Sequence, residues 1–245
     1  MATAIYLAMT ASEFAQQTSF SADIAWMACH FSLYGTGLTD LPSSLPVGSL
    51  LMINDRIPFR KHDPVRITDQ ILPLIETLEC SGVVLDFQQP FTESLQHLAV
   101  HLCDVLPCPV AVTEAYAAAT DSPVFLSPCP HHVHLEEYIA PWTGRKLWLD
   151  LAADAENIML TNEGSVVSPY PPWDIPEEGY RDHMLHCHYL TETGADYARF
   201  TLWRTQDDLH DLMSEASEYG IDTFVGLYQE WNQMQKPPCF SARRS

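Results

Sequence analysis

The sequence predicts an α/β protein, a (β/α)8 TIM barrel with a small antiparallel β insertion after its seventh strand. Eight short apolar runs follow one another along the 245 residues. Helical stretches separate most of these runs, and the alternation breaks only over residues 153–203. Alternating strands and helices build a parallel sheet, and barrels of this length often form one domain. We therefore expect a single domain over 1–245 that contains a β-hairpin insertion over 153–203.

The first half of the chain supplies four of the strands. They are expected at Ala4–Met9, Ile24–Phe31, Ser49–Asn54 and within Ser81–Pro90. A helix is well marked between the third and the fourth strand, because Asp63 can cap it and Pro64 suits its first position. Its apolar side chains recur on one face, as a helix packed against a sheet requires. These are Ile67, Ile71, Leu74, Ile75 and Leu78.

The second half supplies the other four strands. Leu95, Leu98, Ala99 and Leu102 repeat at helical spacing before the fifth strand. The strands are expected at Pro109–Thr113, Val124–Leu126, Leu147–Leu151 and Thr223–Tyr228, with short helices at Leu135–Ile139 and 206–219. Thr205 and Asp208 are spaced as a capping box for the last helix.

Residues 153–203 carry the pattern of two hairpins. The first spans 156–167 and turns at Asn162–Gly164, and the second spans 185–203 and turns near Gly194.

An open, doubly wound sheet is the alternative to a barrel. No GxGxxG or P-loop pattern follows any strand, which weakens the nucleotide-binding form of that alternative.

The composition restricts the partners. The chain has 32 acidic and 12 basic residues, a net charge of −20. This field repels phosphate backbones and anionic lipid, so we expect no nucleic-acid and no membrane partner, while neutral and cationic ligands fit.

The seven cysteines have no CxxC spacing, and the N-terminus lacks the basic region of a signal peptide. We expect a cytoplasmic protein without a cofactor.

The predicted strands end in polar side chains, where a barrel places its active site. We expect these side chains to form a cleft that binds a polyhydroxylated ligand; the alternative is that they only meet solvent. The candidate ligand-binding residues are Asn54, Asp55, Arg56, Gln88, Tyr116, Asp150, Tyr228 and Trp231. The candidate catalytic residues are Asp86, Glu114 and Glu230.

The stretch SGVVLDFQQP, Ser81–Pro90, resembles the fourth-strand signature D-G-x-D-x-D-x-E-x-P of family 18 glycoside hydrolases, the chitinase-like barrels. Gly82, Asp86 and Pro90 match in register, and Phe87 stands where the family usually has Trp. Ser81 and Val84 replace two aspartates. The family's strand-three pattern S-x-G-G is not evident, whereas its antiparallel insertion after strand seven has a counterpart in 153–203.

The most informative departure is Gln88, which stands where the family has its general-acid glutamate. An amide has no proton to give near neutral pH, so Gln88 cannot act as the acid, although it can still hold a sugar hydroxyl. The resemblance therefore implies a barrel that binds glycan without cutting it. Asp86 with Glu114, or Glu230, could supply relocated carboxylates. An ion pair with Arg56 is the structural alternative for Glu114 and Glu230.

Aromatic and histidine residues leave further alternatives open. Tyr34, Phe87, Tyr116, Trp173, Tyr228 and Trp231 follow strand ends or lie in long loops, where rings stack on sugars or pack in the core. Two histidine-rich segments, Cys129–His134 and His183–His188, have residue types that bind zinc but no recognised zinc spacing. We expect hydrogen-bonded histidines and no metal site. A metal-assisted hydrolase and a protein-interaction scaffold remain the alternatives to a carbohydrate-binding barrel.

Overall fold

A computed structural model describes residues 4–16, 25–31, 37–39, 41–56, 62–171, 174–176 and 178–234. The chain divides into two compact units. The barrel unit consists of Met1–Pro128, Trp142–Asp150 and Gly220–Leu227. The insertion unit consists of Cys129–Pro141, Leu151–Tyr219 and Tyr228–Ser245. The single domain over 1–245 stays a prediction, and each unit is described by itself below.

The barrel unit holds a nine-stranded sheet in the order β1-β14-β8-β7-β6-β5-β4-β2-β3. Eight of these strands make the parallel sheet, and β3 adds antiparallel to β2. An isolated parallel bridge between Met9 and Trp26 brings the first two parallel strands together, so the sheet nearly closes. This arrangement confirms the (β/α)8 prediction. The strands are β1 (Ala4–Ala8), β2 (Ala25–Phe31), β3 (Leu38–Thr39), β4 (Leu50–Asn54), β5 (Gly82–Asp86), β6 (Val110–Thr113), β7 (Val124–Leu126), β8 (Leu147–Leu151) and β14 (Thr223–Leu227).

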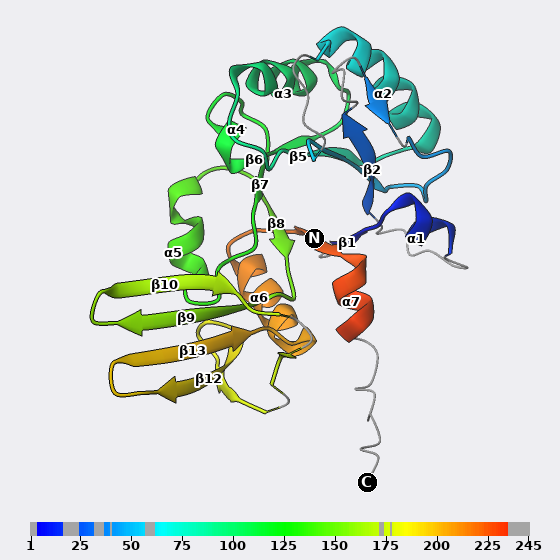
Figure 1. Cartoon of the computed structure of the whole chain (residues 1–245). Helices are drawn as coiled ribbons and strands as arrows, with labels where there is room; N and C mark the ends of the chain where they lie inside the picture. Colours follow the sequence, from blue (N-terminus) through cyan, green and yellow to red (C-terminus); the bar gives the residue numbers. More distant parts are fainter. Residues whose placement is uncertain are drawn as a thin grey trace. The chain divides into compact units, whose positions relative to one another are not determined.

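Helices α2 (Pro64–Leu78) and α3 (Glu93–Val105) lie side by side along the outer face of β4, β5 and β6 (Figure 1). Asp63 caps α2 by accepting hydrogen bonds from the backbone N–H groups of Val65 and Arg66, as predicted. The short helices α1 (Ala11–Ala15) and α4 (Glu114–Ala117) were not predicted. Glu114 therefore begins a helix rather than ending a strand. No helix within the described ranges is long and apolar enough to cross a membrane.

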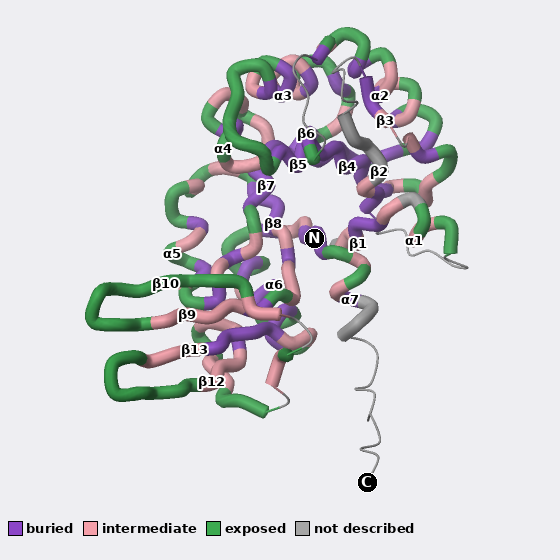
Figure 2. Tube along the Cα trace, in the orientation of Figure 1, coloured by how far each residue is buried: buried purple, intermediate pink, exposed green. Residues whose placement is uncertain are grey.

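Alternate residues of the strands fill the inside of the barrel, and β4, β5 and β6 are buried along nearly their whole length (Figure 2). The filling mixes large and small side chains, as a tapering barrel interior requires. They are Ala8, Ala25, Leu50, Met52, Val84, Ala111, Phe125, Trp148 and Val225. Gly82 belongs to this packing, because a Cβ atom there would lie 3.0 Å from the Trp148 ring and 3.0 Å from the carbonyl oxygen of Pro109. The absent side chain makes room for the indole.

The insertion unit holds a five-stranded antiparallel sheet in the order β10-β9-β13-β12-β11. Its strands are β9 (Ala155–Thr161), β10 (Gly164–Pro169), β11 (Tyr180–Asp182), β12 (Cys187–Thr193) and β13 (Tyr197–Trp203). Both predicted hairpins, β9–β10 and β12–β13, are confirmed. One face of this sheet bears an apolar cavity of about 410 Å³, lined among others by Ile158, Tyr189 and Phe200.

Three helices and one buried cation complete the insertion unit. The helices are α5 (Leu135–Ile139), α6 (Gln206–Glu218), which begins with the predicted Thr205–Asp208 capping box, and α7 (Tyr228–Met234). Tyr228 therefore starts a helix, where a strand end was predicted. The buried Arg204 guanidinium donates to the carbonyl oxygens of Cys129 at 2.6 Å and His186 at 3.1 Å. These bonds fix the Cys129–Pro141 segment to the end of β13.

The Gly82–Trp148 contact leads to a stability prediction. We expect Gly82→Ala to lower the free energy of unfolding by about 1–3 kcal/mol, because the new methyl group overpacks the barrel interior. Urea unfolding followed by tryptophan fluorescence and circular dichroism measures this change. Trp148→Phe removes the ring atom that a Cβ at 82 would meet, so the double variant should lose less stability than the two single losses summed. Additive losses would show that the indole does not require the glycine.

Candidate functional site

Asn54 and Asp86 lie next to each other at the carboxyl ends of β4 and β5, where the strand register pairs them. Met52 and Val84, two residues earlier, are part of the barrel interior. Because side chains alternate along a strand, Asn54 and Asp86 face the same interior at its carboxyl-terminal end. This is the end at which barrels place their functional groups.

Asp86 is a buried carboxylate, only 7% exposed. Burial raises the pKa of its carboxyl to about 6, and the negative charge of Asp55 adds to this rise. A hydrogen bond from Gln88 and the positive charge of Arg56 act in the opposite direction. The group can therefore exchange a proton near neutral pH, which an ordinary surface aspartate does not do.

Gln88 is an exposed side chain that turns back onto Asp86. Its amide nitrogen Nε2 lies 3.0 Å from Oδ1 and 3.3 Å from Oδ2 of Asp86, and donates to the carboxylate. A hydrogen bond to the charged form favours ionisation, so Gln88 offsets part of the desolvation of Asp86. The i, i+2 spacing after a buried strand end is the sequence signal for this pair.

Asp55 and Asn54 hold the loops around this pair. The buried Asp55 carboxylate accepts hydrogen bonds from the backbone N–H groups of Gln88 at 2.9 Å and Gln89 at 3.1 Å. Asn54 Oδ1 accepts from the backbone N–H of Arg56 at 3.2 Å, whereas Asn54 Nδ2 is buried without a hydrogen-bond partner. Asp55 was predicted to bind a ligand, and these contacts show that it braces the loop after β5. Arg56 is exposed.

The Tyr116 side chain belongs to the packing beneath the loop after β5. It is fully buried, lies edge-on to Phe87 and stacks with Phe91 at a centroid distance of 5.3 Å. Its hydroxyl accepts a hydrogen bond from the backbone N–H of Thr92. A ring covered in this way does not offer the open face that a sugar would stack on.

Glu114 and Asp150 are the other two predicted carboxylates of the barrel unit, and both are half-buried. The β5–β6 register ends with Leu85 opposite Val112, so Asp86 is one residue beyond the last pair and Glu114 is two. Ser127 Oγ donates to Glu114 Oε2 at 3.0 Å. Asp150 lies two residues after Trp148 and so faces the barrel interior, as Asp86 does. Thr113, which shares the interior face with Ala111, was missed, although strand alternation would have indicated it.

The remaining candidates, Tyr228, Glu230 and Trp231, belong to α7 of the insertion unit. Glu230 accepts a hydrogen bond from the backbone N–H of Ala153 at 2.8 Å, and burial raises the pKa of its carboxyl. Trp231 is buried and meets His210 edge-on. Tyr34 and Trp173, two of the predicted aromatic residues, lie outside the described residues.

The histidine-rich segments form hydrogen bonds with carboxylates and backbone. His188 contacts Asp208 at 2.7 Å, His132 contacts Glu156 at 2.7 Å, and His186 contacts Glu215. The buried His131 lies 3.1 Å from the carbonyl oxygen of Asp154, and burial lowers the pKa of its imidazole to about 3. Nowhere in the described part of the chain do three His, Cys, Asp or Glu side chains group to hold a metal ion.

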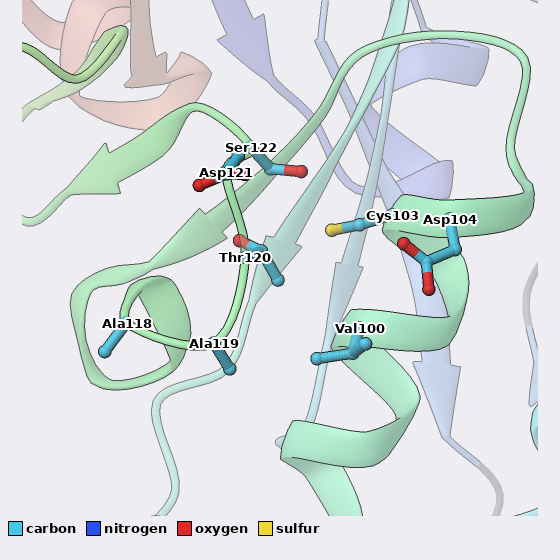
Figure 3. Close-up of a pocket in the computed structure, with 8 residues that line it drawn as sticks. All are labelled: Val100, Cys103, Asp104, Ala118, Ala119, Thr120, Asp121 and Ser122. Atoms are coloured by element: carbon cyan, nitrogen blue, oxygen red, sulfur yellow. The ribbon is translucent and has the colours of Figure 1, made fainter.

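A cavity of about 520 Å³ lies between the end of α3 and the loop that precedes β7 (Figure 3). Its lining comes from segments that lead into β6 and β7, so it is at the opposite end of these strands from Asp86. Cys103 and Val100 face the loop Ala118–Ser122 in Figure 3. Burial raises the pKa of the Cys103 thiol, which makes it a poor nucleophile. This cavity offers no catalytic group comparable to Asp86.

Solved structures of similar fold include a spore cortex-lytic enzyme and proteins named as chitinases. The spore cortex-lytic enzyme SleL of Bacillus cereus aligns with 95% of this chain and 74% of its own, with a TM-score of 0.59 and 10% identity. A chitinase from Chromobacterium violaceum aligns with 92% of this chain over 93% of its own length, with a TM-score of 0.57 and 11% identity. The C-terminal domain of a putative chitinase from Desulfitobacterium hafniense aligns with 93% of this chain over 94% of its own length, with a TM-score of 0.56 and 11% identity. These likenesses show the fold. No protein-family model and no curated protein matches the sequence.

The buried carboxylate leads to a prediction about pH. The unfolded chain ionises Asp86 near pH 4 and the folded chain near 6. Between these values only the folded state retains the proton, so its stability falls as the pH rises through this window and stays lower above it. We expect Asp86→Asn to raise the free energy of unfolding at about pH 7 by on the order of 1–3 kcal/mol, and to lose this advantage near pH 4.

Urea unfolding at several pH values measures this effect. Asp69→Asn, on the exposed face of α2, is the matched control with the same change in charge. A stability gain of equal size in both variants would attribute the effect to net charge and not to the burial of Asp86.

Proposed function

We propose that this chain is a glycoside-hydrolase-like barrel that binds carbohydrate at the carboxyl ends of its parallel strands and lacks the standard chitinase general acid. The observation that carries this proposal is the Gln88–Asp86 contact. At the position where the resembling family has an acid, this chain has an amide that is hydrogen-bonded to the neighbouring carboxylate. Five cysteines whose side chains the structure describes are free, which supports a cytoplasmic location.

The groups at the strand ends suit a polyhydroxylated ligand. Gln88 has an exposed amide with one further donor and an acceptor, and Asp86 accepts hydrogen bonds when ionised. Asn54 Nδ2 is a donor with no partner. Sugars bind through such combinations of donors and acceptors, and without an acid they stay intact. The names of the solved structures with this fold point to the same ligand class.

The test measures binding and cleavage separately. We expect the protein to bind a chitin oligosaccharide in calorimetry and to leave it uncut in a product assay. Gln88→Glu places a dissociable proton where the amide now contacts Asp86, so we expect it to release shorter oligosaccharides. Gln89→Glu adds the same charge one residue later and should cut nothing. Absence of binding to any member of a neutral and charged oligosaccharide panel would contradict the proposal and favour a protein-interaction scaffold.

An active hydrolase with relocated carboxylates is the second candidate. Asp86 and Glu114 lie at the ends of neighbouring strands, and the raised pKa of Asp86 is what a proton donor needs. If the protein cleaves an oligosaccharide, Glu114→Gln should reduce the turnover number at least about 100-fold, whereas Glu93→Gln should leave it unchanged. Cleavage that Glu114→Gln does not affect would exclude this pair.

A further inference from the structure

Among the described residues, the carboxyl ends of β4 to β8 have more carboxylates than basic side chains. Asp86 and Asp150 face the barrel interior, and Glu114 follows the end of β6. Arg56 is the one Lys or Arg side chain on the described barrel-unit segments that directly follow β4, β5, β6 and β7. Neutral sugar hydroxyls can also be bound by amides alone, so a neutral glycan does not require this set of carboxylates.

Asn54 gives an independent indication that a polar ligand is bound here. It is 0% exposed, it is the register neighbour of Asp86, and its Nδ2 has no partner. A buried donor without a hydrogen bond costs about 1–3 kcal/mol, and such groups are rare in native proteins unless water or a ligand completes them. Asn54 Nδ2 is therefore a buried donor beside the Asp86 carboxylate that still needs an oxygen acceptor.

The net charge of the whole chain favours a positively charged ligand. A net charge of −20 raises the local concentration of cations and lowers that of anions. The chemistry that fits both observations is a ligand with ammonium groups, for the carboxylates, next to hydroxyl oxygens, for the Asn54 amide. An ammonium group has three donors and no acceptor, which complements an ionised carboxylate.

We infer that the saccharide bound at these strand ends carries free amino groups, as a 2-amino-2-deoxy sugar does, and that Asp86 pairs with one ammonium group. This inference rests on the proposed function and specifies its substrate class. Gln88 then orients the Asp86 carboxylate, and Asp150 faces the same interior as a second acceptor.

Two hexasaccharides that differ only in N-acetylation test the inference. Calorimetry compares the glucosamine hexamer with the N-acetylglucosamine hexamer, in a buffer in which the amines are protonated and Asp86, with its pKa of about 6, is ionised. We expect the amino form to bind roughly tenfold more tightly, the effect of one favourable ion pair. Asp86→Asn should remove this preference, and Asp150→Asn should reduce it.

Glu76→Gln is the matched control, because it removes one negative charge from the exposed face of α2. The preference for the amino form should survive this substitution. Equal binding of both hexamers would overturn the inference and leave the proposed function standing. An equal loss of preference in Glu76→Gln and Asp86→Asn would overturn it as well, since the preference would then be general attraction to an acidic protein. Failure of both hexamers to bind would remove the inference together with chitin-type binding.

Discussion

The inside of the parallel barrel has to be filled by side chains, and this constraint governs the rest of the barrel unit. Trp148 supplies the largest of the filling groups, and Gly82 leaves room for its ring because it has no side chain. Interiors pack as densely as organic crystals, so a large ring at one position demands a small residue opposite. The glycine in the chitinase-like motif thus has a packing reason of its own in this chain, independent of any catalytic role.

The same filling determines the electrostatics at the carboxyl end. Val84 and Trp148 occupy the interior directly below Asp86 and Asp150. Apolar groups cannot solvate an ionised carboxylate, so the core itself raises the pKa of Asp86. The protein offsets part of this cost with the Gln88 amide. A carboxylate that stays buried at such a cost, offset only in part by the Gln88 amide and the positive charge of Arg56, is typical of functional sites, where stability is given up for chemistry.

Much of the fold could be predicted because its signals are local. The eight strands, the Asp63 cap and both hairpins depend on alternation, capping and turn residues within a few positions. The candidate site was harder, since exposure and partners depend on distant contacts. Tyr116 follows a strand in the sequence, yet Phe87 and Phe91 from another loop bury it. The sequence indicates that Asp55 binds a ligand. In the structure, both of its carboxylate oxygens accept hydrogen bonds from the backbone of Gln88 and Gln89, 33 and 34 positions away.

The buried Arg204 has a consequence for the order in which the insertion unit is made. Its bond to the Cys129 carbonyl joins positions separated by 75 residues. A ribosome adds about 5–20 residues per second, so Arg204 is synthesised several seconds after Cys129. During this time the Cys129–Pro141 segment lacks the guanidinium that later holds it. In this time β8 and all five strands of the antiparallel sheet are synthesised. The Cys129–Pro141 segment is thus tied to the end of β13 only after the whole antiparallel sheet has been synthesised, while α6 and α7 still have to follow.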